Sequence, residues 1–199
     1  MTRHAERNHL RERIAHLAAR LMAEDGIEDY ALAKRKAARQ AGAPAARQMP
    51  DNDEIEAALR AYRKLYQNEH TSQLRELRRL ALETMDEFAA FDPYLTGSVL
   101  KGSAGKYADI HLQLYTDNAK AIEHLLLNRR IDFRCGEVRL YAGEMAVDAP
   151  TLSFTRNGVE IHLTVLSSRE LRSHLKASAE GKPIERARRD AVQALIAAE

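Results

Sequence analysis

One stretch near the middle of the chain constrains the fold most: residues 97–114, which read GSVLKGSAGKYADIHLQL. It begins with a glycine-serine pair and continues as a loop rich in Gly, Ser and Lys. It runs into residues 109–115, where polar and apolar side chains alternate strictly, as they do in a half-buried strand. Asp109 and His111 fall on the polar side of that strand. The stretch therefore predicts a phosphate-binding turn that leads into a strand carrying metal-binding side chains.

Two helices are predicted at the N-terminal end. Residues 3–24 and about 28–40 carry apolar side chains at intervals of three and four, and Gly26 is expected to end the first helix. The second helix has a cationic side, formed by Lys34, Arg35, Lys36 and Arg39. Such a group is ordinarily a solvated helix face. The alternative is a contact for RNA or for an acidic partner.

A linker is predicted over residues 42–52, GAPAARQMPDN, because Pro44 and Pro50 interrupt helical structure there. Asp51 or Asn52 can cap the helix that follows. A long helical pattern then covers about 53–91, with a break near 70–72. We accordingly predict an N-terminal helical segment over 1–50 and a second domain over 51–199, with its core at about 75–166.

The pattern changes from residue 94 onward. Short strands are predicted over 94–96, 109–115, 131–135, 138–141, 152–155 and 159–166, and helices over 119–128 and from Pro183 to 198. Asp117 is a candidate cap for the first of these helices. Asn157-Gly158 lies between two alternating runs and predicts a hairpin. Helices, then strands mixed with helices, favour an α+β fold with a sheet flanked by helices.

Two of these strands have matching polar faces. Asp109 and His111 share one side of the first, and Glu160 and His162 share one side of the other, because side chains on a strand repeat every second residue. If both strands lie in one sheet, their apolar faces share the core and the four polar side chains converge. Grouped carboxylates repel one another unless a cation or proton compensates them. A divalent metal at this face would bind phosphate oxygens.

The turn before the strand has the residues that an anion requires. Gly97 permits positive φ and close backbone approach, Ser98 supplies a hydroxyl and an amide, and Lys101 adds positive charge. Gly102 leaves backbone amides accessible. Because the loop returns directly to Asp109, a phosphate held here would lie close to the acids.

In this pattern the chain resembles the DNA polymerase β-type nucleotidyltransferase superfamily, in particular its minimal bacterial members. That family has an apolar strand, Gly-Ser, two residues, Arg-Gly, a short loop, Ser-Asp-x-Asp in a strand and a third acid in a later strand. Here Gly97 and Ser98 match Gly-Ser, and residues 108–112, Ala-Asp-Ile-His-Leu, stand at the position of Ser-Asp-x-Asp-Leu. Glu160 matches the third acid. The resemblance covers roughly residues 75–166.

The resemblance implies a mixed sheet flanked by helices and a nucleoside triphosphate bound with a divalent metal, Mg²⁺ or Mn²⁺. Gly97, Ser98, Lys101 and Gly102 would bind the phosphates. Metal ligands would be Asp109, His111 and Glu160, and Asp109 and Glu160 would be the catalytic residues. The reaction would transfer a nucleoside monophosphate to an acceptor hydroxyl on RNA, a protein or a small molecule.

Three positions depart from the family pattern. His111 replaces the second acid, Lys101 replaces Arg, and Ala108 replaces Ser. A neutral imidazole suits Mn²⁺, Zn²⁺ or Ni²⁺ better than Mg²⁺, and Lys lacks the bidentate fork of Arg. The alternative interpretation is therefore a catalytically degenerate member that binds a nucleotide, RNA or a partner protein without turnover.

The composition indicates more about the cellular compartment of the protein than about its function. The formal net charge is +2 and Trp is absent, so neither a strongly basic surface nor an aromatic stacking platform for nucleic acid is indicated. The single cysteine, Cys135, cannot form an internal disulfide, which favours a reducing compartment. The charged N-terminus has no apolar run that would indicate a signal peptide or membrane span. We expect a cytoplasmic protein with no membrane partner.

Overall fold

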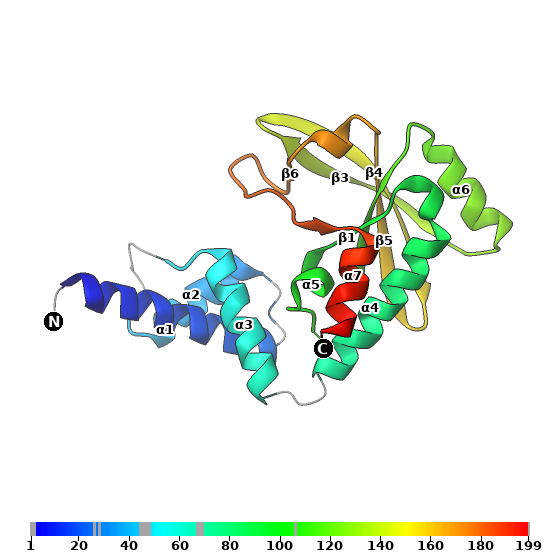
Figure 1. Cartoon of the computed structure of the whole chain (residues 1–199). Coiled ribbons are helices and arrows are strands. Elements are labelled where there is room, and N and C mark those ends of the chain that lie inside the picture. The colour runs from blue at the N-terminus through cyan, green and yellow to red at the C-terminus, as the bar shows by residue number, and fades with distance from the viewer. Residues whose placement is uncertain are drawn as a thin grey trace. The chain divides into compact units, whose positions relative to one another are not determined.

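The computed structural model describes residues 3–25, 27, 29–43, 49–66, 70–105 and 107–198. Gly26, Glu28 and Pro44, which entered the predictions above, lie outside these ranges. None of the helices in the described ranges has the length and apolarity needed to cross a membrane. The helices are α1 Arg3–Glu24, α2 Tyr30–Gln40, α3 Asn52–Tyr66, α4 His70–Glu87, α5 Gly97–Lys101, α6 Ala119–Asn128 and α7 Arg189–Ala197, with short 3₁₀ turns η1 Ala89–Phe91 and η2 Glu170–Arg172 (Figure 1). The strands are β1 Tyr94–Thr96, β2 Ile110–Tyr115, β3 Arg134–Ala142, β4 Met145–Arg156, β5 Val159–Leu166, β6 Leu175–Lys176 and β7 Arg186–Ala187.

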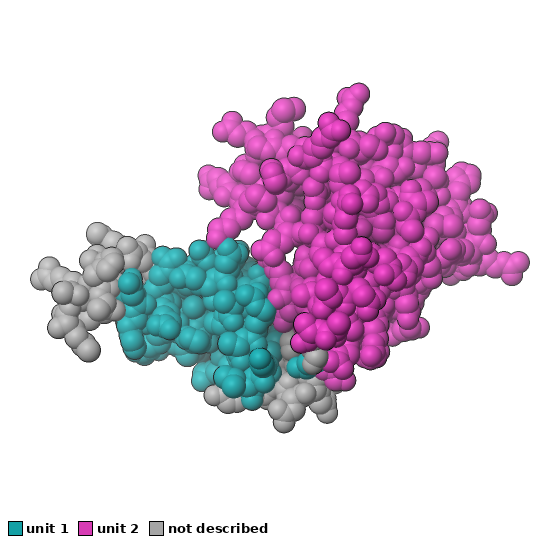
Figure 2. Space-filling model, in the orientation of Figure 1, with its two compact units in different colours: residues 1–71 teal, residues 72–199 magenta. Residues whose placement is uncertain are grey.

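The chain divides into two compact units, Met1–Thr71 and Ser72–Glu199, coloured separately in Figure 2. We predicted the division at residue 50, and the structure has it after residue 71. The reason is that α3 contributes Ile55 and Leu59 to the same buried cluster as Ile14 of α1 and Ala37 of α2. Alanines on α2 let these helices approach closely. The N-terminal helical segment is therefore a three-helix unit with a core of its own.

A capping box begins α3. The Asp51 carboxylate accepts a hydrogen bond from the Glu54 amide at 2.9 Å, and the Glu54 carboxylate accepts one from the Asp51 amide at 2.7 Å. Arg11 of α1 also donates to Glu54, at 2.8 Å from Nε and 2.6 Å from Nη2, and this guanidinium lowers the pKa of the Glu54 carboxyl. Asp51, one of the two predicted caps, therefore caps α3. Glu54, its partner in the capping box, also connects α3 to α1 through Arg11.

Asp51→Ala is expected to lower the unfolding free energy of the three-helix unit by about 1 kcal/mol, because the first turn of α3 loses its side-chain acceptor. Urea denaturation followed by circular dichroism measures this loss. Glu12→Ala, at an exposed position of α1, is the control and should change stability much less. Equal losses in the two variants would contradict the assigned cap.

The second unit contains a seven-stranded sheet in the order β6-β3-β4-β5-β2-β1-β7. β2 and β5 run parallel, and their neighbours pair antiparallel, so the sheet is mixed and the predicted α+β class is confirmed. The predicted helix over 119–128 and strand over 159–166 are confirmed with the same bounds. The helical pattern predicted over 53–91 is two helices, as the predicted break near 70–72 required, but the break falls earlier: α3 ends at Tyr66 and α4 starts at His70.

Three local expectations are corrected. The two predicted strands around Gly136 are one strand, β3, in which a Cβ at Gly136 would lie 2.8 Å from Oγ1 of the facing Thr151. Asp117 does not cap α6, because its carboxylate accepts from the Ser168 amide at 3.0 Å. The last helix begins at Arg189 and not at Pro183, because residues 186–187 pair with β1.

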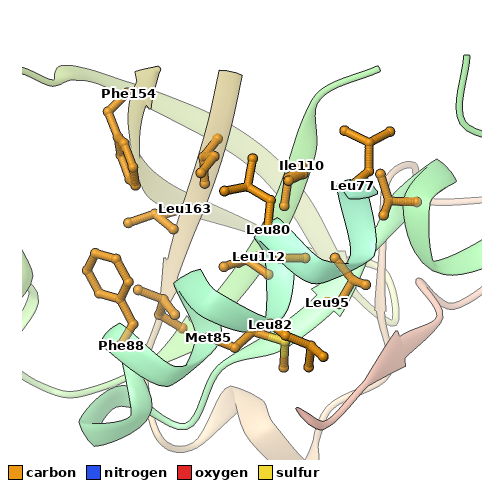
Figure 3. Close-up of a cluster of buried hydrophobic side chains, with 14 of the residues drawn as sticks. Leu77, Leu80, Leu82, Met85, Phe88, Leu95, Ile110, Leu112, Phe154 and Leu163 are labelled. Atoms are coloured by element: carbon orange, nitrogen blue, oxygen red, sulfur yellow. The ribbon is translucent and has the colours of Figure 1, made fainter. Parts of the chain in front are cut away.

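Helices cover the apolar face of the sheet. The inward side chains of β2 and β5, among them Leu112 and Leu163, pack against α4 (Leu80, Met85 and Phe88 among them), as Figure 3 shows. Further buried residues come from α6 and α7, namely Ile122, Leu126 and Val192. This face is the predicted shared core.

The opposite face is covered only in part. Towards the carboxyl ends of β2 and β5, Tyr115 and Leu166 belong to a second buried cluster with Leu175 of β6. Gln113 is buried there and accepts a hydrogen bond from the Tyr115 hydroxyl at 2.9 Å. The cover leaves the amino ends of the two strands accessible, where Asp109 and Glu160 lie.

Candidate functional site

Three strands bring the predicted polar residues together. In the sheet register His111 of β2 lies between Thr96 of β1 and His162 of β5. The parallel register pairs Ile110 with Ile161, so Asp109 and Glu160 lie side by side at the amino ends of the same two strands. The predicted convergence of four polar side chains on one sheet face is confirmed.

The imidazole of His162 lies between the two acids. Its Nε2 is 3.3 Å from Oδ2 of Asp109 and 3.8 Å from Oε1 of Glu160. Its ring stacks on that of His111, with centroids 4.8 Å apart and an interplanar angle of 11°. His162 is not among the predicted metal ligands, and the structure gives it contacts to Asp109 and His111. The two-residue periodicity predicted the correct face for His162. Its contacts to Asp109 and His111 depend on the parallel register of β2 and β5.

His111 is packed against the glycine turn. Gly97 has φ of +74°, and a Cβ added there would lie 3.4 Å from Cδ2 of the His111 ring. The predicted positive φ at Gly97 is therefore confirmed. Burial, with a smaller effect of His162 and against an opposing effect of Asp109, lowers the pKa of His111. The lowered pKa disfavours the imidazolium form of His111 beside Asp109.

The turn itself is a short helix. α5 runs from Gly97 to Lys101 and ends at Gly102, which has φ of +77°. The carbonyl of Ser98 accepts hydrogen bonds from the amides of Gly102 and Ser103, the second at 3.0 Å. Thr96, just before the turn, donates its hydroxyl hydrogen to the His111 carbonyl at 3.2 Å. This hydrogen bond holds the residue before the turn against His111 of the polar cluster. The other predicted phosphate-binding residues, Ser98, Lys101 and Gly102, follow in the same turn.

Arg134 also contacts the polar cluster, and this contact was not predicted from the sequence. Its guanidinium forms an ion pair with the Glu160 carboxylate. Arg134 lies at the start of β3, and the ladder connects it through Ser153 of β4 to His162 of β5. No local motif marks an exposed arginine two strands away, so only the antiparallel pairing could have found it.

The chemistry of the donors fits a borderline metal better than Mg²⁺. Two carboxylates and imidazole nitrogen are ligands that Mn²⁺, Zn²⁺ and Ni²⁺ accept. Among the described residues, however, no group of three or more His, Cys, Asp or Glu side chains is arranged to hold a metal ion. The Glu160 carboxylate is turned to Arg134, and the two imidazoles lie flat against each other. Joint coordination therefore requires Glu160 to leave Arg134.

Two surface hollows of the second unit lie away from this cluster. One of about 650 Å³ is lined by the end of α4 and by α6, including Glu87, Lys120 and His124. Another of about 450 Å³ lies along α4 beside Asn157 and Val159. Neither has Asp109 or Glu160 in its lining, and the first combines one acid, Glu87, with one histidine, His124. The polar end of the sheet face remains the candidate site on chemical grounds.

Comparisons of the chain with family models, with curated proteins and with solved structures found no match. The resemblance to the nucleotidyltransferase superfamily therefore stays a prediction from residues 97–111 and Glu160.

Proposed function

We propose that this chain is a nucleotidyltransferase-like protein that binds a nucleoside triphosphate with a divalent metal and transfers its nucleoside monophosphate to an acceptor hydroxyl, with release of pyrophosphate. One observation carries the proposal. The parallel register sets Asp109 beside Glu160, and Gly97 of the preceding turn packs against His111 on the adjoining position. Two acids and a glycine turn at one end of a mixed sheet are the arrangement that such a reaction needs.

In this proposal each group has a separate task. Asp109, His111 and Glu160 hold the metal, which supplies neutralisation of charge on the phosphate oxygens. The backbone of Gly97 and Gly102, with Ser98 and Lys101, binds and orients the triphosphate. Glu160 also accepts the proton of the acceptor hydroxyl when Arg134 moves aside. The acceptor is RNA, a protein or a small molecule, and the compartment is the cytoplasm.

The direct test is thermal unfolding with each nucleoside triphosphate and Mg²⁺ or Mn²⁺. A ligand at 100 times its dissociation constant stabilises the folded state by about 2.7 kcal/mol, which raises the Tm by several degrees. We expect such a rise only when nucleotide and metal are both present, and a larger one with Mn²⁺. Absence of any rise with every nucleotide and both metals would refute the proposal.

His111→Asp is expected to raise the affinity for Mg²⁺ and to lower stability in the absence of metal. A third carboxylate beside Asp109 increases the repulsion that a hard cation relieves. Isothermal titration calorimetry with Mg²⁺ measures the first effect. His124→Asp, at an exposed position of α6, is the matched control and should leave Mg²⁺ affinity unchanged. A variant that folds but binds Mg²⁺ no better than wild type would show that the absence of a carboxylate at position 111 does not limit the affinity for Mg²⁺.

A second candidate function is binding without turnover. The Arg134–Glu160 ion pair and the stacked imidazoles favour it, because both engage groups that catalysis would need. The cations of α2 would then contribute the contact surface: Arg35, Lys36 and Arg39 are exposed and Lys34 is half-buried. Under this alternative, nucleotide or RNA binds without requiring metal, and a triphosphate labelled at its α-phosphate transfers no label.

A further inference from the structure

Arg78 joins the long helix α4 to the short helix α5. Only 5% of its surface is exposed. Its Nε donates to the Val99 carbonyl at 3.1 Å, and its Nη2 donates to the Leu100 carbonyl at 3.0 Å. Both carbonyls belong to the turn that follows Gly97.

These two carbonyls are a natural place for a buried cation. The last carbonyls of a helix have no partner within the helix, and α5 is too short to provide partners for all of them. A buried guanidinium is costly unless its donors are satisfied, and planar donors aimed at two neighbouring carbonyls meet both needs. The interaction therefore fixes α5 against α4, whose apolar side is anchored in the core by Leu77 and Leu80.

The position of α5 determines what the proposed phosphate site offers. Gly97 at its start packs on His111, and Gly102 at its end directs the chain into Ser103, which is 5% exposed. Arg78 donates to the Val99 and Leu100 carbonyls, which lie between these two ends in the chain. Because Nε and Nη2 donate to carbonyls of the turn and the side chain is buried, we assign Arg78 a role in holding the turn and not in binding phosphate directly.

We propose that Arg78 is a positioning residue: it holds the turn at residues 97–102 in the geometry that binds the triphosphate of a nucleotide. This inference rests on the proposed function for its ligand, and on the two hydrogen bonds for its mechanism. Lys cannot replace it, because an ammonium is a compact donor without the fork that reaches two carbonyls.

Arg78→Lys tests the proposal, with Arg79→Lys as the matched control. Arg79 is the next residue of the same helix, exposed, and paired with Glu76 at 2.5 Å. We expect Arg78→Lys to weaken nucleotide binding by about tenfold, the order expected for one lost hydrogen bond to a charged group. Amide hydrogen exchange at residues 97–104 should speed up by a similar factor, while exchange in β2 and β5 stays as in wild type. Arg79→Lys should change neither quantity.

The outcomes separate the two proposals. Wild-type affinity and wild-type exchange at 97–104 in Arg78→Lys would overturn the positioning role. Faster exchange spread evenly over the second unit would also overturn it, since that result indicates general destabilisation. If the wild-type protein binds no nucleotide with any metal, the proposed function fails and so does the ligand assigned to Arg78. The exchange measurement then still decides whether Arg78 orders the turn.

Discussion

Asp109→Asn is expected to abolish the metal-dependent stabilisation by nucleotide. Asn keeps the shape of the side chain and one oxygen but loses the charge that attracts a cation. Asp109 lies beside Glu160 at the amino end of the parallel pair, with Oδ2 at 3.3 Å from His162. Since the pair with His162 is partly exposed, its own loss should lower stability by less than about 1 kcal/mol. Thermal unfolding with and without nucleotide and Mn²⁺ measures both effects.

Asp148→Asn provides the matched control. Asp148 is also a carboxylate with a cationic partner, Arg139 Nε at 2.7 Å from Oδ1, and it lies on β4 outside the segment, Thr151–Arg156, that pairs with β5. Its variant should keep the full nucleotide response. An Asp109→Asn protein that still responds to nucleotide and metal as wild type does would exclude Asp109 as a ligand.

Leu112→Ala is expected to lower the unfolding free energy of the second unit by about 2–5 kcal/mol. Leu112 is fully buried and occupies the centre of a leucine row, with Leu95 of β1 on one side and Leu163 of β5 on the other. Truncation removes favourable burial and leaves a cavity that strands on both sides hold open. Because the adjacent residue is His111, the nucleotide response should weaken in the same variant.

Urea denaturation, followed through exchange-protected amides of β2 and β5, measures this loss for the second unit alone. Leu127→Ala removes the same atoms at a position that is 62% exposed, and should cost far less. Similar losses in both variants would show that Leu112 lies outside the core that the unit depends on.

Alternation and turn chemistry allowed much of the fold to be predicted. β5 and α6 were predicted with the same bounds because their periodicities are long and uninterrupted. β6 and β7 were missed because two-residue strands carry no period, and only pairing with β3 and β1 creates them. The division of the chain was misplaced because Pro50 does not end the packed unit: α3, which follows it, shares a buried cluster with α1 and α2.

The site was predictable to the extent that it depends on strand faces. Asp109, His111, Glu160 and His162 follow from two-residue periodicity, together with a shared core. Arg78 and Arg134 were not predictable, since each reaches the site from another element over a long sequence separation. Tertiary register, which no local pattern encodes, decides which cation faces which acid.

The pairing of β1 with β7 has a consequence for synthesis of the chain. Leu95 pairs with Ala187, so the outer edge of the strand before Gly97 is satisfied only by one of the last strands made. At ribosomal speeds of about 5–20 residues per second, that edge waits on the order of 5–20 s for its partner. During this interval its free amides and carbonyls can pair with another nascent chain. Shortening the chain before residue 186 would make the delay permanent and would favour aggregation through the same edge that borders the turn.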